Sequence, residues 1–359
     1  MNEEAIKLTS YFGERRRVAG DGFAADALLD LYGKHEAATS ILLRGAEGFG
    51  AKRHPRTDMS LTLSEDLPLI AVAVDSRARI EPLAAATAEI TGTGLVTLER
   101  ARLLCDDIEP GDIEAVTPYY GGDQETKLTI YVGRQERAYR VPAFMAVCDL
   151  LYRRGIAGAT ALLGVDGTAH GTRERAAFFS RNAGTPMMVI AVGAGARILR
   201  VLPELGGLLE RPLLTLEQVR ICKRDGELLA TPAALPAADS SGMPVWHKLM
   251  VYTSEAALHD GQPVHRAIVR RLWAAGLSGA TTQRGMWGFN GDYPPHGDRL
   301  LQAGRRVPAV TIVIDSPERI AAAFAIIDEL TAEQGLVTSE WVPAIRPGGA
   351  GQRQAPLRK

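Results

Sequence analysis

The sequence predicts an α+β fold in which one unit of strands and helices is repeated three times along 359 residues. Three sets of similar segments carry this prediction, and they recur in the same order about every 120 residues. The first set is IKLTSYFG, TKLTIYVG and HKLMVYTS, the second is DLPLIAVAVDS, GTPMMVIAVGA and RVPAVTIVIDS, and the third is GLVTLERARLL, PLLTLEQVRI and GLVTSEWVPA. A repeat of this length is typical of a whole domain rather than of a solenoid unit.

Each unit is expected to run β-α-β-β-α-β, and the middle copy shows the pattern most clearly. LTIYV alternates apolar positions and is rich in β-branched residues, which predicts a strand. PAFMAVCDLLYRRG places Phe144, Val147, Cys148 and Leu151 at helical spacing, with proline at its start and glycine at its end. ATALLG and PMMVIAV follow as strands, ARILRVLPELGGLL as a helix interrupted by Pro203, and LTLEQVRIC as the last strand. This order is that of a ferredoxin-like unit.

Three ferredoxin-like domains are therefore expected, at residues 5–107 (copy 1), 125–224 (copy 2) and 246–345 (copy 3). The composition of residues 108–124 and 225–245 is typical of linkers, and that of residues 346–359 of a disordered tail. Helices cover only one face of such a sheet, so the other face must pack on something. We expect the three open faces to pack on one another, which makes the chain a monomer that acts as an intramolecular pseudo-trimer.

Composition excludes several classes of protein. The chain is 46% hydrophobic and 23% charged with a formal net charge of −1, which indicates a globular protein without bulk attraction to nucleic acid or to an anionic membrane. Its longest apolar runs are too short to span a membrane, and the acidic start MNEEAIKLTS does not resemble a signal peptide, so we expect a cytoplasmic protein without membrane insertion. The three cysteines form no C-x-x-C pair, which argues against a structural zinc site.

A glycine-rich box follows the second strand of each copy and is the main candidate for ligand binding. It matches neither standard phosphate-binding motif. Two interpretations stay open: a strand exit that needs glycine for its turn, or a nest of backbone N–H groups that binds an anion. The candidate ligand-binding residues are Arg44, Gly45, Glu47, Gly48, Phe49, Gly50 and Lys52 in copy 1, Gly164, Asp166 and Gly167 in copy 2, and Arg284, Gly285, Trp287, Gly288 and Phe289 in copy 3.

The box differs among the copies in a way that bears on binding. Copies 1 and 3 share an arginine, two glycines and a phenylalanine, whereas copy 2 keeps only the glycines. We therefore predict that the three clefts are not equivalent and that the loop of copy 2 is degenerate. In contrast, Lys7, Lys127 and Lys248 recur at the start of the first strand and are interpreted as exposed strand-entry residues.

The segments KLTIYVG, RGAEGFGA, LSEDLPLIAVAVDS and GLVTLE resemble an uncharacterised bacterial and archaeal family related to PII signalling proteins. The resemblance covers about 100 residues of each copy and implies three tandem PII-like domains. It also implies small ligands, often adenine nucleotides, bound in clefts between units, with further contacts from a long loop between the second and third strands.

The resulting hypothesis is a non-catalytic regulatory or signalling protein that binds AMP, ADP, ATP or a similar anion in the clefts between its copies. A protein target would be contacted through the long loops AKRHPRTDMSLTLSED, TAHGTRERAAFFSRNAG and NGDYPPHGDRLLQAGRR. The sequence offers no nucleophile–base pair, so no catalytic residue is assigned. Two alternatives stay open: a nucleotide-processing enzyme that uses the same clefts, and a metal-binding cation-tolerance scaffold that uses the loop residues His54, His170 and His296.

Overall fold

The computed structural model describes residues 2–20, 22–50, 56–58, 66–169, 172–173, 185–291, 293–297 and 307–346. Copy 1 contains β1 (Asn2–Gly13), α1 (Ala24–Lys34), β2 (Thr39–Arg44), β3 (Glu47–Phe49), β4 (Arg56–Thr57), β5 (Pro68–Ser76), α2 (Arg77–Thr91) and β6 (Leu95–Cys105). Copy 2 contains β7 (Glu125–Gly133), β8 (Arg137–Ala138), β9 (Val141–Pro142), α4 (Ala143–Arg153), β10 (Gly158–Ala169), β11 (Thr172–Arg173), β12 (Pro186–Ala194), α5 (Gly195–Leu208), β13 (Leu213–Arg224) and β14 (Glu227–Leu228). Copy 3 contains β15 (Val245–Ser254), β16 (Leu258–His259), β17 (Gln262–Pro263), α6 (Val264–Ala274), β18 (Ala280–Arg284), β19 (Trp287–Asn290), β20 (His296–Gly297), β21 (Pro308–Asp315), α7 (Pro317–Leu330) and β22 (Leu336–Ile345).

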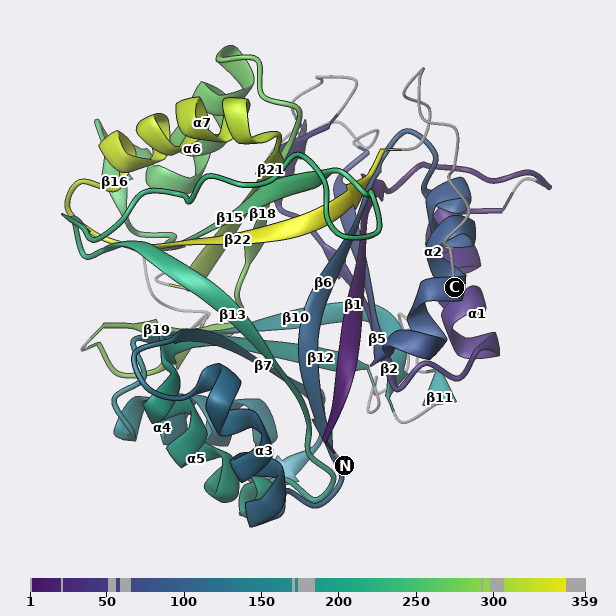
Figure 1. Ribbon diagram of the computed structural model, residues 1–359. Helices are drawn as coiled ribbons and strands as arrows, with labels where there is room; N and C mark the ends of the chain where they lie inside the picture. Colours follow the sequence, from purple (N-terminus) through teal and green to yellow (C-terminus); the bar gives the residue numbers. More distant parts are fainter. Residues whose placement is uncertain are drawn as a thin grey trace.

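The strands of all three copies lie at the centre, and the helices lie outside them in three groups (Figure 1). The prediction of three tandem ferredoxin-like α+β domains is wrong, because these strands are hydrogen-bonded into one 18-stranded sheet rather than three separate sheets. Part of that sheet closes on itself as an antiparallel barrel, in the order β1, β6, β13, β7, β12, β10, β2, β5 and back to β1. The physical reason is that the second and fourth strands of each copy extend past their own unit and pair with the other copies.

The central strands are buried on both faces, which explains their nearly continuous apolar sequences. In β5, the side chains of Ile70, Val72 and Val74 point into a core shared by all three copies. The alternate residues Leu69 and Ala71 pack instead against the helices of copy 1. Equivalent strands divide their side chains in the same way between the shared core and the helical cores of copies 2 and 3.

The segment between copies 1 and 2 is not an extended linker. Residues 108–124 contain α3 (Pro110–Tyr120), whose proline at the first turn and Glu109–Asp112 capping box favour helix initiation. Val116 and Tyr120 of α3 are buried in the helical core of copy 2. This segment therefore adds a third helix to that copy. Most of the predicted tail, residues 347–359, lies outside the described residues.

The glycine-rich boxes form the joints between copies. We use "joint" for the place where the end of one copy's second strand pairs with the second strand of another copy. At the copy 1–copy 3 joint β3 pairs with β18, at the copy 3–copy 2 joint β19 pairs with β10, and at the copy 2–copy 1 joint the end of β10 pairs with β2. In each joint a glycine (Gly48, Gly288 or Gly167) has no room for a Cβ, because that atom would clash with a backbone carbonyl of the neighbouring copy.

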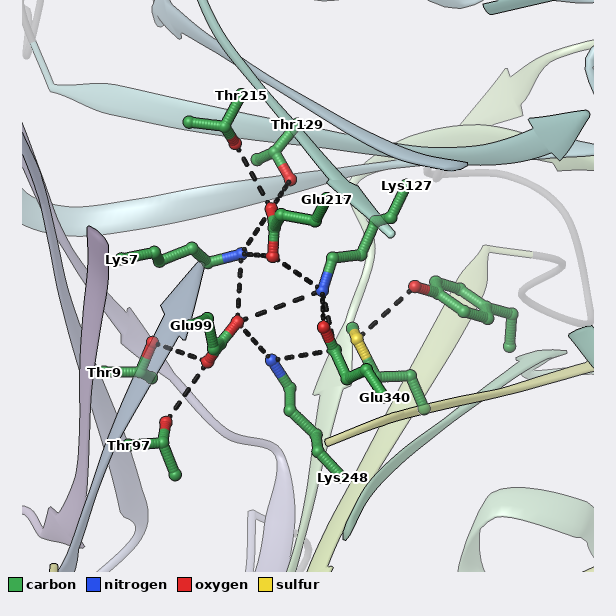
Figure 2. Close-up of polar contacts among 12 residues, drawn as sticks. Lys7, Thr9, Thr97, Glu99, Lys127, Thr129, Thr215, Glu217, Lys248 and Glu340 are labelled. Carbon is green, nitrogen blue, oxygen red and sulfur yellow. Dashed lines mark hydrogen bonds and ion pairs between the residues drawn. The ribbon is translucent and has the colours of Figure 1, made fainter. Parts of the chain in front are cut away.

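Six charged side chains meet where the three copies come together, one lysine and one glutamate from each copy (Figure 2). They alternate in a closed ring, and every lysine lies between two glutamates. The nitrogen–oxygen distances around this ring run from 2.6 to 3.5 Å. In order, the members of the six-charge ring are Lys7, Glu217, Lys127, Glu340, Lys248 and Glu99.

The strand register places each lysine directly opposite the glutamate of its own copy, and the lysine then also reaches the glutamate of another copy. Lys7 donates to Glu217 at 3.0 Å, for example, although the two residues belong to copies 1 and 2. Hydroxyl groups complete the arrangement, since Thr9 and Thr97 donate to the second oxygen of Glu99 at 3.1 and 3.2 Å. The ring therefore links all three copies.

The interpretation of the three lysines as exposed strand-entry residues is wrong. Their exposed fractions are 4% for Lys7, 0% for Lys127 and 3% for Lys248. The alternation of the first strand puts Lys7 on the side opposite to Ile6 and Leu8, which pack against the helices of copy 1. In a strand that is buried on both faces, this second side is the centre of the molecule rather than solvent.

Opposite charges in the six-charge ring favour the ionised forms of Glu99 and Lys127. Burial alone would raise the pKa of Glu99, but Lys248, Lys7 and Lys127 hold the pKa of this carboxyl well below its usual range. Burial alone would lower the pKa of Lys127, but Glu217 and Glu340 raise it above the ordinary lysine value. The three carboxylates are close enough together to bind a metal ion, yet each already accepts hydrogen bonds or ion pairs from ammonium groups.

No helix in the described ranges is both long enough and apolar enough to cross a membrane.

The joints predict a matched pair of glycine variants. Gly48→Ala should lower the free energy of unfolding by about 1–3 kcal/mol, because the added Cβ would meet the carbonyl of Ala280 and push the two copies apart. Gly50→Ala, two residues away, places its Cβ in open space and should change that free energy by no more than about 0.5 kcal/mol. Urea unfolding measures both values, and equal costs would contradict this account of the joint.

Candidate functional site

A cavity of about 470 Å³ lies between copies 1 and 3. One wall comes from the end of β1 and the turn that follows it, and another from the glycine box at Gly48, Phe49 and Gly50. Copy 3 contributes Ser278–Thr281 and the side chains of Ile312 and Ile314 on β21. A volume of this size is within the usual range of small-molecule binding sites.

The cavity is rich in cationic side chains although the chain as a whole is close to neutral. Five arginines line it, and they come from three separate segments: Arg15, Arg16, Arg17, Arg56 and Arg346. Asp66 is the carboxylate among the described lining residues. A concave surface with this charge attracts small anions, and guanidinium groups suit the geometry of phosphate and carboxylate oxygens.

The arginines are held in place by different contacts. Arg56 pairs with Asp66 at 2.7 Å, so the one acidic side chain is already neutralised. The guanidinium of Arg17 lies over the ring of Phe23, and that of Arg346 over Trp246. Such stacking helps to fix the orientation of the planar guanidinium groups.

Arg16 is the arginine whose position most directly suggests a ligand. Its Nε atom is buried and has no hydrogen-bond partner within the described part of the chain. The guanidinium lies over Gly92 at the end of α2, where a Cβ would clash with it. The partial negative charge at a helix C-terminus favours a cation in this position.

The candidate residues from the glycine box are not all brought together by the structure. Gly48, Phe49 and Gly50 line the cavity, while Gly45 packs against Pro68. Arg44 is half-exposed and pairs with Glu14 at 3.0 Å. Glu47 and Arg284 belong to the copy 1–copy 3 joint but do not line the cavity. The remaining members lie in the other two joints or outside the described residues: Gly285, Trp287, Gly288 and Phe289 at the copy 3–copy 2 joint, Gly164, Asp166 and Gly167 at the copy 2–copy 1 joint, and Lys52 outside.

Two residue types kept in copies 1 and 3 contribute to packing. The ring of Phe49 is buried in the helical core of copy 3, and that of Phe289 in the helical core of copy 2, where it meets Tyr152 edge-on at 5.3 Å. Arg284 is bound by Asp58 at 2.6 Å and Glu255 at 2.5 Å. Thus the phenylalanine of each box packs in the helical core of a neighbouring copy, and Arg284 links copy 3 to Asp58 of copy 1.

Sequence reasoning missed the arginines of the cavity. The run Glu14–Arg17 follows the first strand of copy 1 only, and this local charge was the available signal. Arg56 and Arg346 carried no such signal, because they come close to Arg16 only through the pairing of strands from different copies. The histidines considered for metal binding give no further support, since His54 and His170 lie outside the described residues and His296 contacts the carbonyl of Pro294.

A comparison with known protein families shows which family the chain belongs to. The model of DUF190, a family described as "Uncharacterized ACR", matches residues 5–103, 125–221 and 246–344. The chain belongs to the DUF190 family. The three matches, one in each copy, confirm that an uncharacterised PII-like family is present here in three tandem copies.

Individual relatives of the DUF190 chain agree with this assignment. A UPF0166 protein of Aquifex aeolicus (strain VF5) is 30% identical over 98 residues, which is 27% of this chain and 90% of the relative. That relative therefore corresponds to a single copy. The crystal structure of aspartate kinase from Synechocystis aligns with 94% of this chain at 11% identity, while the chain spans 44% of the kinase. The TM-score of this alignment is 0.24.

A buried group of titratable residues lies beside β3 at the copy 1–copy 3 joint. Glu47 is 8% exposed and its Oε1 atom is 3.6 Å from Nε2 of His265 on α6. Neither Oε1 of Glu47 nor Nδ1 of His265 has a hydrogen-bond partner among the described residues. Burial raises the pKa of Glu47 to about 7, with Asp58 and Glu255 adding to the shift and Arg266 and Arg284 opposing it.

His265 is neutral in the same environment. Burial, together with the positive charges of Arg266 and Arg284, lowers the pKa of His265 to about 4. A neutral histidine beside a carboxyl that titrates near neutrality makes the copy 1–copy 3 joint sensitive to pH. Since β3 also forms part of the cavity wall, the charge of Glu47 lies close to the proposed site.

Glu47→Gln should remove one component of the pH dependence of stability. The folded state keeps the Glu47 proton up to about pH 7, whereas the unfolded chain releases it near pH 4.5, so this residue costs increasing stability as pH rises between these values. The free-energy advantage of the variant over the natural chain should therefore grow by roughly 3 kcal/mol across this window. Urea unfolding from pH 4.5 to 8 gives the difference.

Glu89→Gln serves as the control, because Glu89 is exposed on α2 of the same copy. Because this control changes only a surface side chain, Glu89→Gln should cost little stability. A flat difference for Glu47→Gln would contradict the burial of an unpaired carboxyl at this joint.

Proposed function

We propose that this DUF190 chain is a non-catalytic regulatory protein that binds a small anionic ligand, such as an adenine nucleotide, in the cavity between copies 1 and 3. The observation that carries the proposal is the set of five arginines around one cavity of about 470 Å³. Phosphate oxygens accept charge-assisted hydrogen bonds from guanidinium groups. The apolar part of a nucleotide would fit against Phe12, Ile312 and Ile314 on the opposite walls.

The lining residues favour binding over catalysis. Among those that the structure describes there is no histidine, cysteine or lysine, and the carboxylate of Asp66 is held by Arg56. Hydroxyl groups are present on Tyr11, Thr91 and Ser278, but no general base lies beside them in the described lining. These groups can donate hydrogen bonds to a ligand without forming a nucleophile–base pair.

Binding at this place would act on the contact between copies. A ligand that touches β1 and the glycine box of copy 1 as well as β21 of copy 3 adds a bridge across the joint. Its binding free energy would then stabilise the closed arrangement of the copies. A ligand that stabilises one arrangement of the copies can thereby change the surface that the protein offers to a target.

Thermal unfolding with AMP, ADP and ATP tests the proposal. A ligand present at 100 times its Kd should add about 2.7 kcal/mol to the free energy of unfolding. Arg16→Ala should abolish most of this gain, since it removes a cavity-lining guanidinium whose buried Nε atom has no hydrogen-bond partner among the described residues. Arg200→Ala, on the exposed face of α5, is the matched control and should keep the gain.

The proposal would be contradicted if none of the three nucleotides stabilised the protein. Release of phosphate or of another nucleotide product in the same samples would favour the enzyme hypothesis instead.

A further inference from the structure

All three joints have the same construction, so a binding site formed by one joint could occur three times. The turn after the first strand shows this equivalence. Arg16, Glu136 and Ala257 each donate their backbone N–H to the carbonyl three residues earlier, at 2.9, 3.0 and 3.0 Å. The carbonyl of each then accepts a hydrogen bond from the start of the following helix, at 2.8 Å in every copy. These three residues are therefore structural counterparts.

Their side chains differ in charge. Copy 1 places a cation at this position, copy 2 an anion and copy 3 a methyl group. The Glu136 carboxylate is directed back to its own turn, where it accepts a hydrogen bond from the N–H of Gly133 at 2.9 Å. An anionic ligand would be attracted by the first of these three turns, repelled by the second and left without a charged partner by the third.

The space at the joints differs as well. The pocket at the copy 3–copy 2 joint has a volume of about 10 Å³, which is too small for any ligand beyond a water molecule. There Asn290 replaces Gly50, and its side chain lies over the backbone of Gly158 from the neighbouring copy. The copy 1–copy 3 joint has glycines, Gly50 and Gly279, at both of these positions.

At two further positions the side chains are more exposed at the copy 1–copy 3 joint than at the other two joints. Tyr11 and Leu95 are partly exposed because they line the cavity. Their counterparts have exposed fractions of 7% and 3% at the copy 3–copy 2 joint (Tyr252 and Leu336) and of 5% and 2% at the copy 2–copy 1 joint (Tyr131 and Leu213). In these two joints the side chains are members of the shared core, whereas Tyr11 and Leu95 pack against that core and stay partly exposed.

We propose that each chain binds one ligand molecule, at the copy 1–copy 3 joint, and that Arg16 determines this choice, while the other two joints serve only to hold the copies together. This inference rests on the proposed function, because it concerns the same cavity. It also means that the sequence of the glycine box does not by itself mark a ligand site. Copy 3 keeps the arginine and phenylalanine of the box, yet Arg284 is used in ion pairs with Asp58 and Glu255 at the copy 1–copy 3 joint. The pocket beside Phe289, at the copy 3–copy 2 joint, has a volume of only about 10 Å³.

Isothermal titration of the full chain with ATP tests the inference. The expected stoichiometry is one ATP per chain. Arg16→Glu, which introduces the residue of copy 2, and Arg16→Ala, which introduces that of copy 3, should each weaken binding at least tenfold, because a charge-assisted contact is lost. Arg137→Ala, in the equivalent turn of copy 2, should keep both the stoichiometry and the affinity within about twofold.

Each outcome separates the two proposals. Two or three bound ATP molecules, or unchanged affinity in both Arg16 variants, would overturn the single-site inference and leave nucleotide binding intact. Absence of binding by ATP, ADP and AMP would overturn the proposed function, and the single-site inference with it. Arg16→Ala, checked for a native circular dichroism spectrum, decides the matter if Arg16→Glu does not fold.

Discussion

The six-charge ring is the interaction on which the rest of the structure depends. Three lysines and three glutamates occupy the centre of the molecule almost without exposure to water, which carries a large desolvation cost. The cost is offset only if every charge meets its partners, and those partners come from different copies. Lys7 needs Glu217 of copy 2, and Lys127 needs Glu340 of copy 3. The ring therefore favours one relative placement of the copies, and the strand pairing at the joints follows from that placement.

Within this closed arrangement, small differences between copies decide where a ligand can bind. The joints share their backbone hydrogen bonds and their close glycine contacts, so the same backbone structure is repeated three times. Ligand binding at each joint then depends on its side chains. At the copy 1–copy 3 joint, Arg16 and the small residues Gly50 and Gly279 leave an open, positively charged cavity. A single chain can vary its three copies independently, which a trimer of identical subunits cannot do.

The sequence carried the repeat, the family and the helices of the middle copy's repeated unit, but neither the additional helix α3 nor the pairing of strands. Family membership followed from segments such as KLTIYVG, and α4 forms where its apolar residues predicted it. The fold class was wrong because local periodicity does not reveal which copy a strand pairs with. Gly48 looked like part of a turn, although it lies in β3, which pairs with β18 of copy 3. Lys127 looked exposed, because an isolated lysine gives no sign that it has a buried partner 213 residues away.

The most direct test of this account is a double-mutant cycle on the ring. Lys127→Met alone should cost about 3–5 kcal/mol of unfolding free energy, because it leaves buried carboxylates without one of their cations. Adding Glu340→Gln restores the balance of charge, so the double variant should be more stable than the sum of the two single changes by 1 kcal/mol or more. Lys34→Met on the exposed end of α1 sets the baseline for losing a lysine. Additive effects, or a Lys127→Met cost no larger than this baseline, would contradict the claim that the ring holds the three copies together.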